Sequence, residues 1–126
     1  MTSAPLRVLA TLVLVGLVGL MIGPFGAVET SVDIWDKAAH FVAFGLILWA
    51  IGVLWRRLPR AWAAMATLSL GGAVELVQGQ VGRDASWADL LADALGVAAA
   101  LGLWIIWRRG RPRAARAERG QTSKTR

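Results

Sequence analysis

Four long apolar runs, separated by short polar segments, set the strongest limit on how this chain can fold. The runs cover about residues 8–23, 38–55, 61–78 and 87–107. A helix of about 16 to 20 residues, rising about 1.5 Å per residue, is long enough to cross a hydrocarbon core about 30 Å thick. With 56% hydrophobic residues, the chain is also more apolar than an ordinary soluble domain. The sequence therefore predicts an all-α polytopic membrane protein, a bundle of four transmembrane helices.

The first apolar run could also be the core of a secretory signal peptide. It follows the basic residue Arg7, and the apolar core of a signal peptide also follows a basic segment. The run is long for a signal core, and the residues around Phe25 lack the small side chain that cleavage prefers. A retained helix is therefore the prediction, ending before Pro24 because proline lacks a backbone N–H. Gly19 and Gly23 have a spacing that permits close helix packing, which is a weak signal alone.

Basic residues gather on one side of the four predicted spans. Four spans place both termini on the same side, and that side holds twelve basic residues: Arg7, Arg56, Arg57, Arg60 and the eight that follow Trp107. The opposite side holds only Lys37 and Arg83. The positive-inside rule then predicts that both termini are cytoplasmic.

The composition changes after Trp107. Residues 108–126 lack apolar periodicity and carry eight of the fourteen basic residues, so we expect a disordered basic cytoplasmic tail after a single membrane domain over residues 1–107. A charge of +6 on a soluble surface would suggest nucleic-acid binding. Here the charge lies at the ends of apolar segments, so no nucleic-acid partner is predicted. Without cysteine, disulfides and thiolate metal sites are excluded.

Ionisable and amide side chains interrupt the apolar pattern where three predicted helices meet the outer side. They are Asp36, Lys37 and His40 at the start of the second helix, Glu75 and Gln78 at the end of the third, Arg83 in the loop, and Asp89 and Asp93 at the start of the fourth. A helical period of 100° places Asp36 with His40 on one face of the second helix, and Asp89 with Asp93 on one face of the fourth. On the third helix it predicts one narrow stripe: Ala64, Thr67, Gly71, Glu75 and Gln78. Such groups are costly beside lipid unless they are paired, hydrated or functional. We therefore expect His40, Glu75 and Asp89 to face a common cavity that opens outward, with at least two of them within about 6 Å and Arg83 at the rim.

Several of these residues also have an ordinary structural interpretation. His40 alone would be satisfied by a backbone carbonyl, and Asp36 and Lys37 suit a solvated helix start. Ser86 and Asp89 have the spacing of a capping box. Glu75 and Asp93 are harder to explain in this way because they lie further inside the predicted spans.

Acids outnumber bases in this region, with Asp36, Glu75, Asp84, Asp89 and Asp93 against Lys37 and Arg83. Desolvated together, these acids cannot all be ionised and unpaired. Either some protons stay bound, or a cation or a cationic substrate group lies among the carboxylates. Asp93 is expected to be one of the unpaired acids, so Asp93→Asn is expected to be tolerated.

Two motifs resemble the signatures of the VanZ-like family. They are Asp36-Lys37-Ala-Ala-His40-Phe41, and Glu75-x-x-Gln78 followed by Arg83, Asp89 and Gly96. The resemblance covers roughly residues 36–101. Asp93 departs from it, because the family usually has asparagine there, and an acid makes the region more negative. The resemblance implies a small bacterial membrane protein, of a family named for low-level resistance to the glycopeptide teicoplanin. It implies polar positions at Asp36, Lys37, His40, Glu75, Gln78, Arg83 and Asp89, and no cofactor.

The leading hypothesis is a protein of the bacterial cytoplasmic membrane that binds a polar head group at the outer leaflet. The partner would be a membrane lipid or a lipid-linked envelope precursor, and a homo-oligomer is compatible with the sequence. The binding positions would be Asp36, Lys37, Gln78, Arg83 and Asp93.

The alternative is a membrane-embedded enzyme with His40, Glu75 and Asp89 in catalytic roles. His40 or Glu75 would be the general base, and Asp36 or Asp89 would orient the histidine. A divalent cation held by Glu75, Asp89 and Asp93 stays open, whereas zinc is disfavoured by the single histidine. A proton or cation relay is disfavoured because the inner halves of the spans lack ionisable residues. A purely structural scaffold is the remaining alternative.

Overall fold

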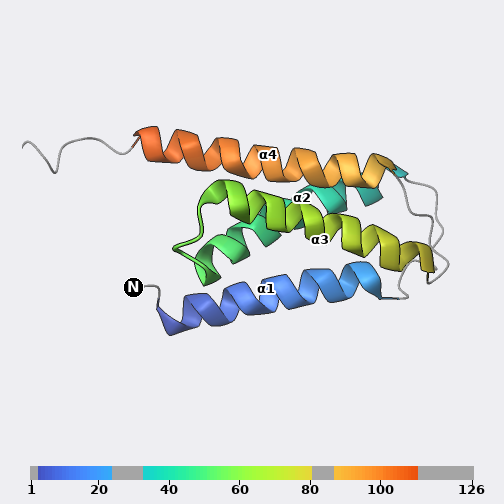
Figure 1. Ribbon diagram of the computed structural model, residues 1–126, viewed down its shortest axis with the longest axis horizontal. Coiled ribbons are helices and arrows are strands. Elements are labelled where there is room, and N and C mark those ends of the chain that lie inside the picture. The colour runs from blue at the N-terminus through green and yellow to red at the C-terminus, as the bar shows by residue number, and fades with distance from the viewer. Residues whose placement is uncertain (1–2, 24–32, 81–86, 111–126) are drawn as a thin grey trace, which may run out of the picture.

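The computed structural model describes residues 3–23, 33–80 and 87–110, and these residues form four α-helices. The helices are α1 (Ala4–Ile22), α2 (Asp33–Leu54), α3 (Arg60–Gln80) and α4 (Trp87–Gly110). Consecutive helices run in opposite directions, so the start of α1 and the end of α4 lie at the same end of the bundle (Figure 1). The predicted all-α four-helix bundle is confirmed.

Two helix ends differ from the sequence prediction. The second apolar run begins at about residue 38, whereas α2 begins earlier, at Asp33. A carboxylate such as Asp36 is favourable there, because the N-terminus of a helix carries a partial positive charge. Similarly, α4 continues past Trp107 and has Arg108 and Arg109 in its last turn, where cations complement the negative end. Residues 108–110 are therefore helical rather than part of the predicted tail, and the rest of that tail, residues 111–126, lies outside the described part of the chain.

The centre of the bundle is α2, which packs against the other three helices, while α1 and α4 lie on opposite sides of the pair α2–α3 (Figure 1). The closest approach joins α2 to α4. A Cβ atom added at Gly96 would overlap the backbone carbonyl oxygen of Phe41, and one added at Gly45 would lie 3.4 Å from the carbonyl oxygen of Gly96. Glycine is therefore required at position 96, whereas an added Cβ atom at Gly45 would make an ordinary contact. A Cβ atom added at Gly19 would meet nothing within 4 Å, so that glycine packs against no other part of the described chain.

The side chains below the polar residues form an apolar core. Phe44 and Ile47 of α2 are fully buried, and Val74 of α3 is almost so. The predicted stripe on α3 is also observed, because Ala64, Thr67, Gly71, Glu75 and Gln78 are all buried. Small residues on this face bring α3 close to its neighbours, as the sequence predicted.

Three helices are long and apolar enough to cross a membrane: Ala4–Ile22, Trp35–Leu54 and Trp87–Arg109. Large aliphatic side chains on α1 are exposed, including Leu12 and Val15, as expected of a surface that contacts lipid. Among the four described helices, α3 is the one that is not apolar enough to be a candidate span on its own. Its small residues and its buried Glu75 and Gln78 explain the lower hydropathy.

Candidate functional site

Five titratable side chains gather where α2 and α4 begin and α3 ends. We call them the polar cluster, and the end of the bundle that holds them the acidic end: Asp36, His40, Glu75, Asp89 and Asp93. Four are buried, and Asp36 is exposed. The cluster's four buried members lie between the apolar core and the acidic end of the bundle.

A hydrogen bond between α2 and α4 organises the polar cluster. Nδ1 of His40 lies 2.8 Å from Oδ1 of Asp93, and both side chains are buried. The imidazole also stacks on Phe44 one turn below, with ring centroids 6.3 Å apart. Asp93 is therefore paired, and the expectation that it is an unpaired acid is wrong. Its partner is His40, which sequence reasoning had assigned to Asp36 or Asp89.

The depth of each residue in its helix explains the pairing. His40 is seven residues into α2, and Asp93 is six residues into α4. At about 1.5 Å per residue, two helices that start at the same end carry these side chains to nearly equal depth. Asp36 and Asp89 lie about one turn nearer the helix starts. The cluster thus has two layers, and His40 and Asp93 belong to the deeper one.

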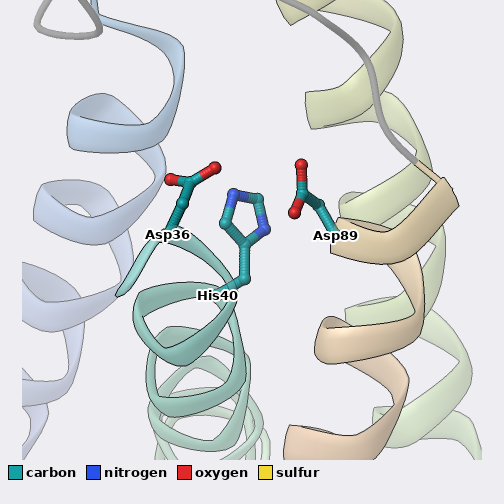
Figure 2. Close-up of side chains that lie close together, drawn as sticks. All are labelled: Asp36, His40 and Asp89. Carbon is teal, nitrogen blue, oxygen red and sulfur yellow. The ribbon is translucent and has the colours of Figure 1, made fainter. Parts of the chain in front are cut away.

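His40 connects both layers. One ligand atom from each of Asp36, His40 and Asp89 lies within 4.8 Å of the other two, and the same holds for His40, Glu75 and Asp93. Figure 2 shows the imidazole of His40 between the carboxyl groups of Asp36 and Asp89. The predicted convergence of His40 with Glu75 and with Asp89 is confirmed. An outward-opening cavity above them stays a prediction.

Buried carboxylate oxygens of Asp89 and Asp93 lack a hydrogen bond to any described residue. They are Oδ1 of Asp89 and Oδ2 of Asp93. Asp89 is only 6% exposed, and Oδ2 of Asp93 faces Gly71, where an added Cβ atom would lie 2.9 Å away. A buried ionised oxygen without a donor is unfavourable by about 1–3 kcal/mol or more. The acidic end is therefore suited to receive a proton, a cation or a hydrogen-bond donor.

Gln78, a predicted binding residue, is hydrogen-bonded within the protein. Its Nε2 donates to the backbone oxygen of Met21 at 2.8 Å. Met21 is one of the last residues of α1, where the backbone carbonyl oxygens receive no hydrogen bond from an N–H group of the same helix. Gln78 thus joins the end of α3 to the end of α1. Sequence periodicity placed it on the buried stripe but did not reveal this partner.

The remaining predicted positions are less informative. Lys37 is half-buried beside Asp36. Arg83, Asp84 and the proposed cap Ser86 lie outside the described residues. Glu75, Asp89 and Asp93, considered from the sequence as a cation site, do not form one of the close groups among the described residues. His40 belongs to both close groups, of which one keeps Glu75 and Asp93 and the other keeps only Asp89.

Comparison with known proteins supports one relationship. A model of the family described as VanZ/LLP1 matches residues 5–108. Neither the curated proteins nor the solved structures contain a match to this chain. The matched region includes all four helices except the last residues of α4 and the first of α1, and it contains the whole polar cluster.

Proposed function

Because the chain belongs to the VanZ/LLP1 family, we propose that it is a membrane protein whose acidic end binds the polar head group of a lipid or a lipid-linked envelope precursor. In this proposal all four helices cross the bacterial cytoplasmic membrane, with both termini in the cytoplasm and the acidic end at the outer leaflet. α3 crosses too, since it lies alongside α2 and α4 (Figure 1). Its polar stripe faces other helices rather than lipid.

The observation that carries the proposal is the buried, unpartnered carboxylate oxygen of Asp89 at the end of an apolar bundle. Head groups lie at the same level as this end when the apolar parts of the helices are in the hydrocarbon core. The cluster is acidic, so the head group must bring a positive charge, either as an amine or as a phosphate with a bound metal ion.

Lipids that purify with the protein test this proposal. The detergent-extracted protein is analysed by native mass spectrometry, together with Asp89→Asn and the matched control Glu118→Gln, which removes one carboxylate from the C-terminal segment. We expect wild type and the control to retain the same lipid or precursor, and Asp89→Asn to lose most of it while staying folded. Equal retention by all three proteins would contradict the proposal. Unfolding of Asp89→Asn would instead support the structural-scaffold alternative.

A link to glycopeptide resistance is part of the same proposal. Expression of the wild-type chain in a susceptible host should raise the teicoplanin concentration needed to stop growth, and Asp89→Asn should raise it less. If the wild-type chain leaves the inhibitory teicoplanin concentration unchanged, the link to resistance is wrong. The lipid-binding proposal is then still tested by mass spectrometry.

A membrane-embedded enzyme is the second candidate, because the 2.8 Å contact with Asp93 holds His40 as a carboxylate holds a catalytic histidine. In this version His40 is the general base and Asp93 its orienting partner. The same co-purified lipid distinguishes the candidates: an enzyme converts it on incubation, and a binding protein returns it unchanged.

A further inference from the structure

The two ring nitrogens of His40 have different surroundings. Nδ1 lies 2.8 Å from Oδ1 of Asp93. A carboxylate only accepts hydrogen bonds, so in a pair of neutral imidazole and carboxylate Nδ1 carries the proton and donates a hydrogen bond to Oδ1 of Asp93. In that tautomer Nε2 has a free lone pair, which is the form of imidazole that binds a metal ion.

Two carboxylates flank this imidazole. Asp36 from the first turn of α2 and Asp89 from the first turn of α4 each bring an oxygen within 4.8 Å of a His40 ring nitrogen and of each other (Figure 2). Two ligands on opposite sides of one transition-metal ion lie about 4.3 Å apart, because each metal–ligand distance is about 2.0–2.2 Å. Small side-chain rotations therefore bring all three groups to a common ion.

The unpartnered oxygen of Asp89 points independently to a ligand. Asp89 is 6% exposed, and its buried Oδ1 accepts no hydrogen bond from the described residues. Figure 2 shows its carboxyl group beside the ring of His40. A divalent cation at this place would satisfy the oxygen and balance the two carboxylates.

We propose that Asp36, Asp89 and Nε2 of His40 bind a divalent transition-metal ion, with Asp93 as the residue that positions the imidazole. A carboxylate that accepts from the other ring nitrogen is the usual support of a metal-binding histidine. One nitrogen and two carboxylates suit ions such as Mn²⁺ better than Ca²⁺ or Mg²⁺, which prefer oxygen ligands alone. The group of His40, Glu75 and Asp93 is less suitable, because Asp93 already occupies Nδ1.

The metal site deepens the proposed function, because an ion at this level would offer open positions to the phosphate oxygens of a head group. It is tested without lipid, so its failure leaves binding of an amine-bearing head group standing. Conversely, loss of lipid binding would leave the metal measurement unaffected.

The test is a titration of the chelator-treated, detergent-purified protein with MnCl₂ alone, followed by electron paramagnetic resonance of free Mn²⁺. We expect one ion per chain, and pulsed spectra with the ¹⁴N coupling of a directly bound imidazole. Asp36→Asn and Asp89→Asn should each weaken binding at least about tenfold. The exposed position of Asp36 makes its variant the safer one for folding. Asp93→Asn should weaken binding about 10- to 100-fold while the ¹⁴N coupling of the remaining bound ion is kept.

Glu118→Gln is the matched control, since it removes a carboxylate from the C-terminal segment without changing a proposed ligand or a residue of the polar cluster. Its affinity for Mn²⁺ should stay within about threefold of wild type. The proposal is overturned by absence of bound Mn²⁺, by absence of ¹⁴N coupling, or by a loss in Glu118→Gln as large as that in Asp36→Asn. Circular dichroism and gel filtration identify variants that fail to fold, and those variants are set aside in favour of Asp36→Asn.

Discussion

The two ends of the bundle handle charge in opposite ways. At the acidic end, His40 and Asp93 are 3% and 0% exposed and bond to each other. At the other end, which we call the basic end, charged groups stay near the surface: Arg7, Arg56, Arg57, Arg60, Arg108 and Arg109. There the guanidinium groups of Arg60 and Arg108 lie over the ring of Trp104, 5.1 and 4.9 Å from its centroid.

Side-chain length accounts for much of this difference. An arginine extends its charged group away from an apolar helix while its stem stays packed, so it needs no buried partner. Aspartate is too short to do so from a buried turn, and its charge must be met inside the protein. The buried aspartates are therefore what we expect of a binding site at the acidic end. The long, exposed arginines are what we expect of side chains that hold the basic end at the membrane surface. The predictions below test this contrast, from the largest expected effect to the smallest.

The first prediction, which has the largest expected effect, concerns the side of the membrane on which each end of the bundle lies. Because the chain has no cysteine, single cysteines can be placed at positions 29, 82 and 118 without background. In intact cells a membrane-impermeant thiol reagent should label Glu29→Cys and Gly82→Cys, and it should label Glu118→Cys only after permeabilisation. The reason is the excess of basic residues on the side of the termini. Labelling of position 118 in intact cells would contradict both the topology and the assignment of the acidic end to the outer leaflet.

The second prediction concerns the helix contact that supports the acidic end. Gly96→Ala places a methyl group on the backbone carbonyl oxygen of Phe41, and neither backbone can move without separating α2 from α4. We expect a loss of about 3 kcal/mol, seen as a lower melting temperature in detergent. Gly102→Ala, in the same helix with nothing within 4 Å of the added atom, is the control and should cost nothing. Equal melting temperatures for the two variants would mean that α2 and α4 are not held this closely.

Much of this fold follows from sequence pattern because the relevant signals are long. Apolar runs separated by short polar segments are sufficient to indicate four antiparallel helices, and the glycines and alanines of α3 indicate its packed face. The beginnings of the helices are less visible. The apolar run gives a helix only from about Ala38, and the structure shows that α2 extends back to Asp33.

Because the helix starts are hard to predict, the prediction of the site is only partly correct. Periodicity brings His40, Glu75 and Asp89 to one region, as observed. Choosing which acid bonds to His40 requires relative depths to within one turn, about 5 Å, and this depends on where α2 and α4 begin. The bond from Gln78 to Met21 has no sequence signal, because it depends on how the end of α1 meets α3.

The third prediction measures the buried pair at the acidic end. Asp93→Ala leaves Nδ1 of His40 buried without its acceptor, and His40→Ala leaves Asp93 without its donor. Each should lower the free energy of unfolding by about 1–3 kcal/mol. The double variant should cost clearly less than the two losses together, because the second substitution removes a group already unpaired. Simple additivity would mean that the two side chains do not interact in the membrane protein.

The smallest expected effect lies at the basic end, at Gly52, and it is the counterpart of the Gly96 test. A Cβ atom at Gly52 would overlap the guanidinium of Arg60, which is the end of a flexible side chain rather than backbone. The side chain should move away and lose its contact with Trp104, a cation–π interaction of about 0.5–1 kcal/mol. Alanine favours a helix over glycine by about 1 kcal/mol, so the net change in Gly52→Ala should be close to zero. In an Arg60→Ala background the same substitution should be stabilising, because no guanidinium remains to be displaced. If Gly52→Ala instead costs as much as Gly96→Ala, Arg60 is held as rigidly as the backbone at the acidic end, and the proposed contrast between the two ends is wrong.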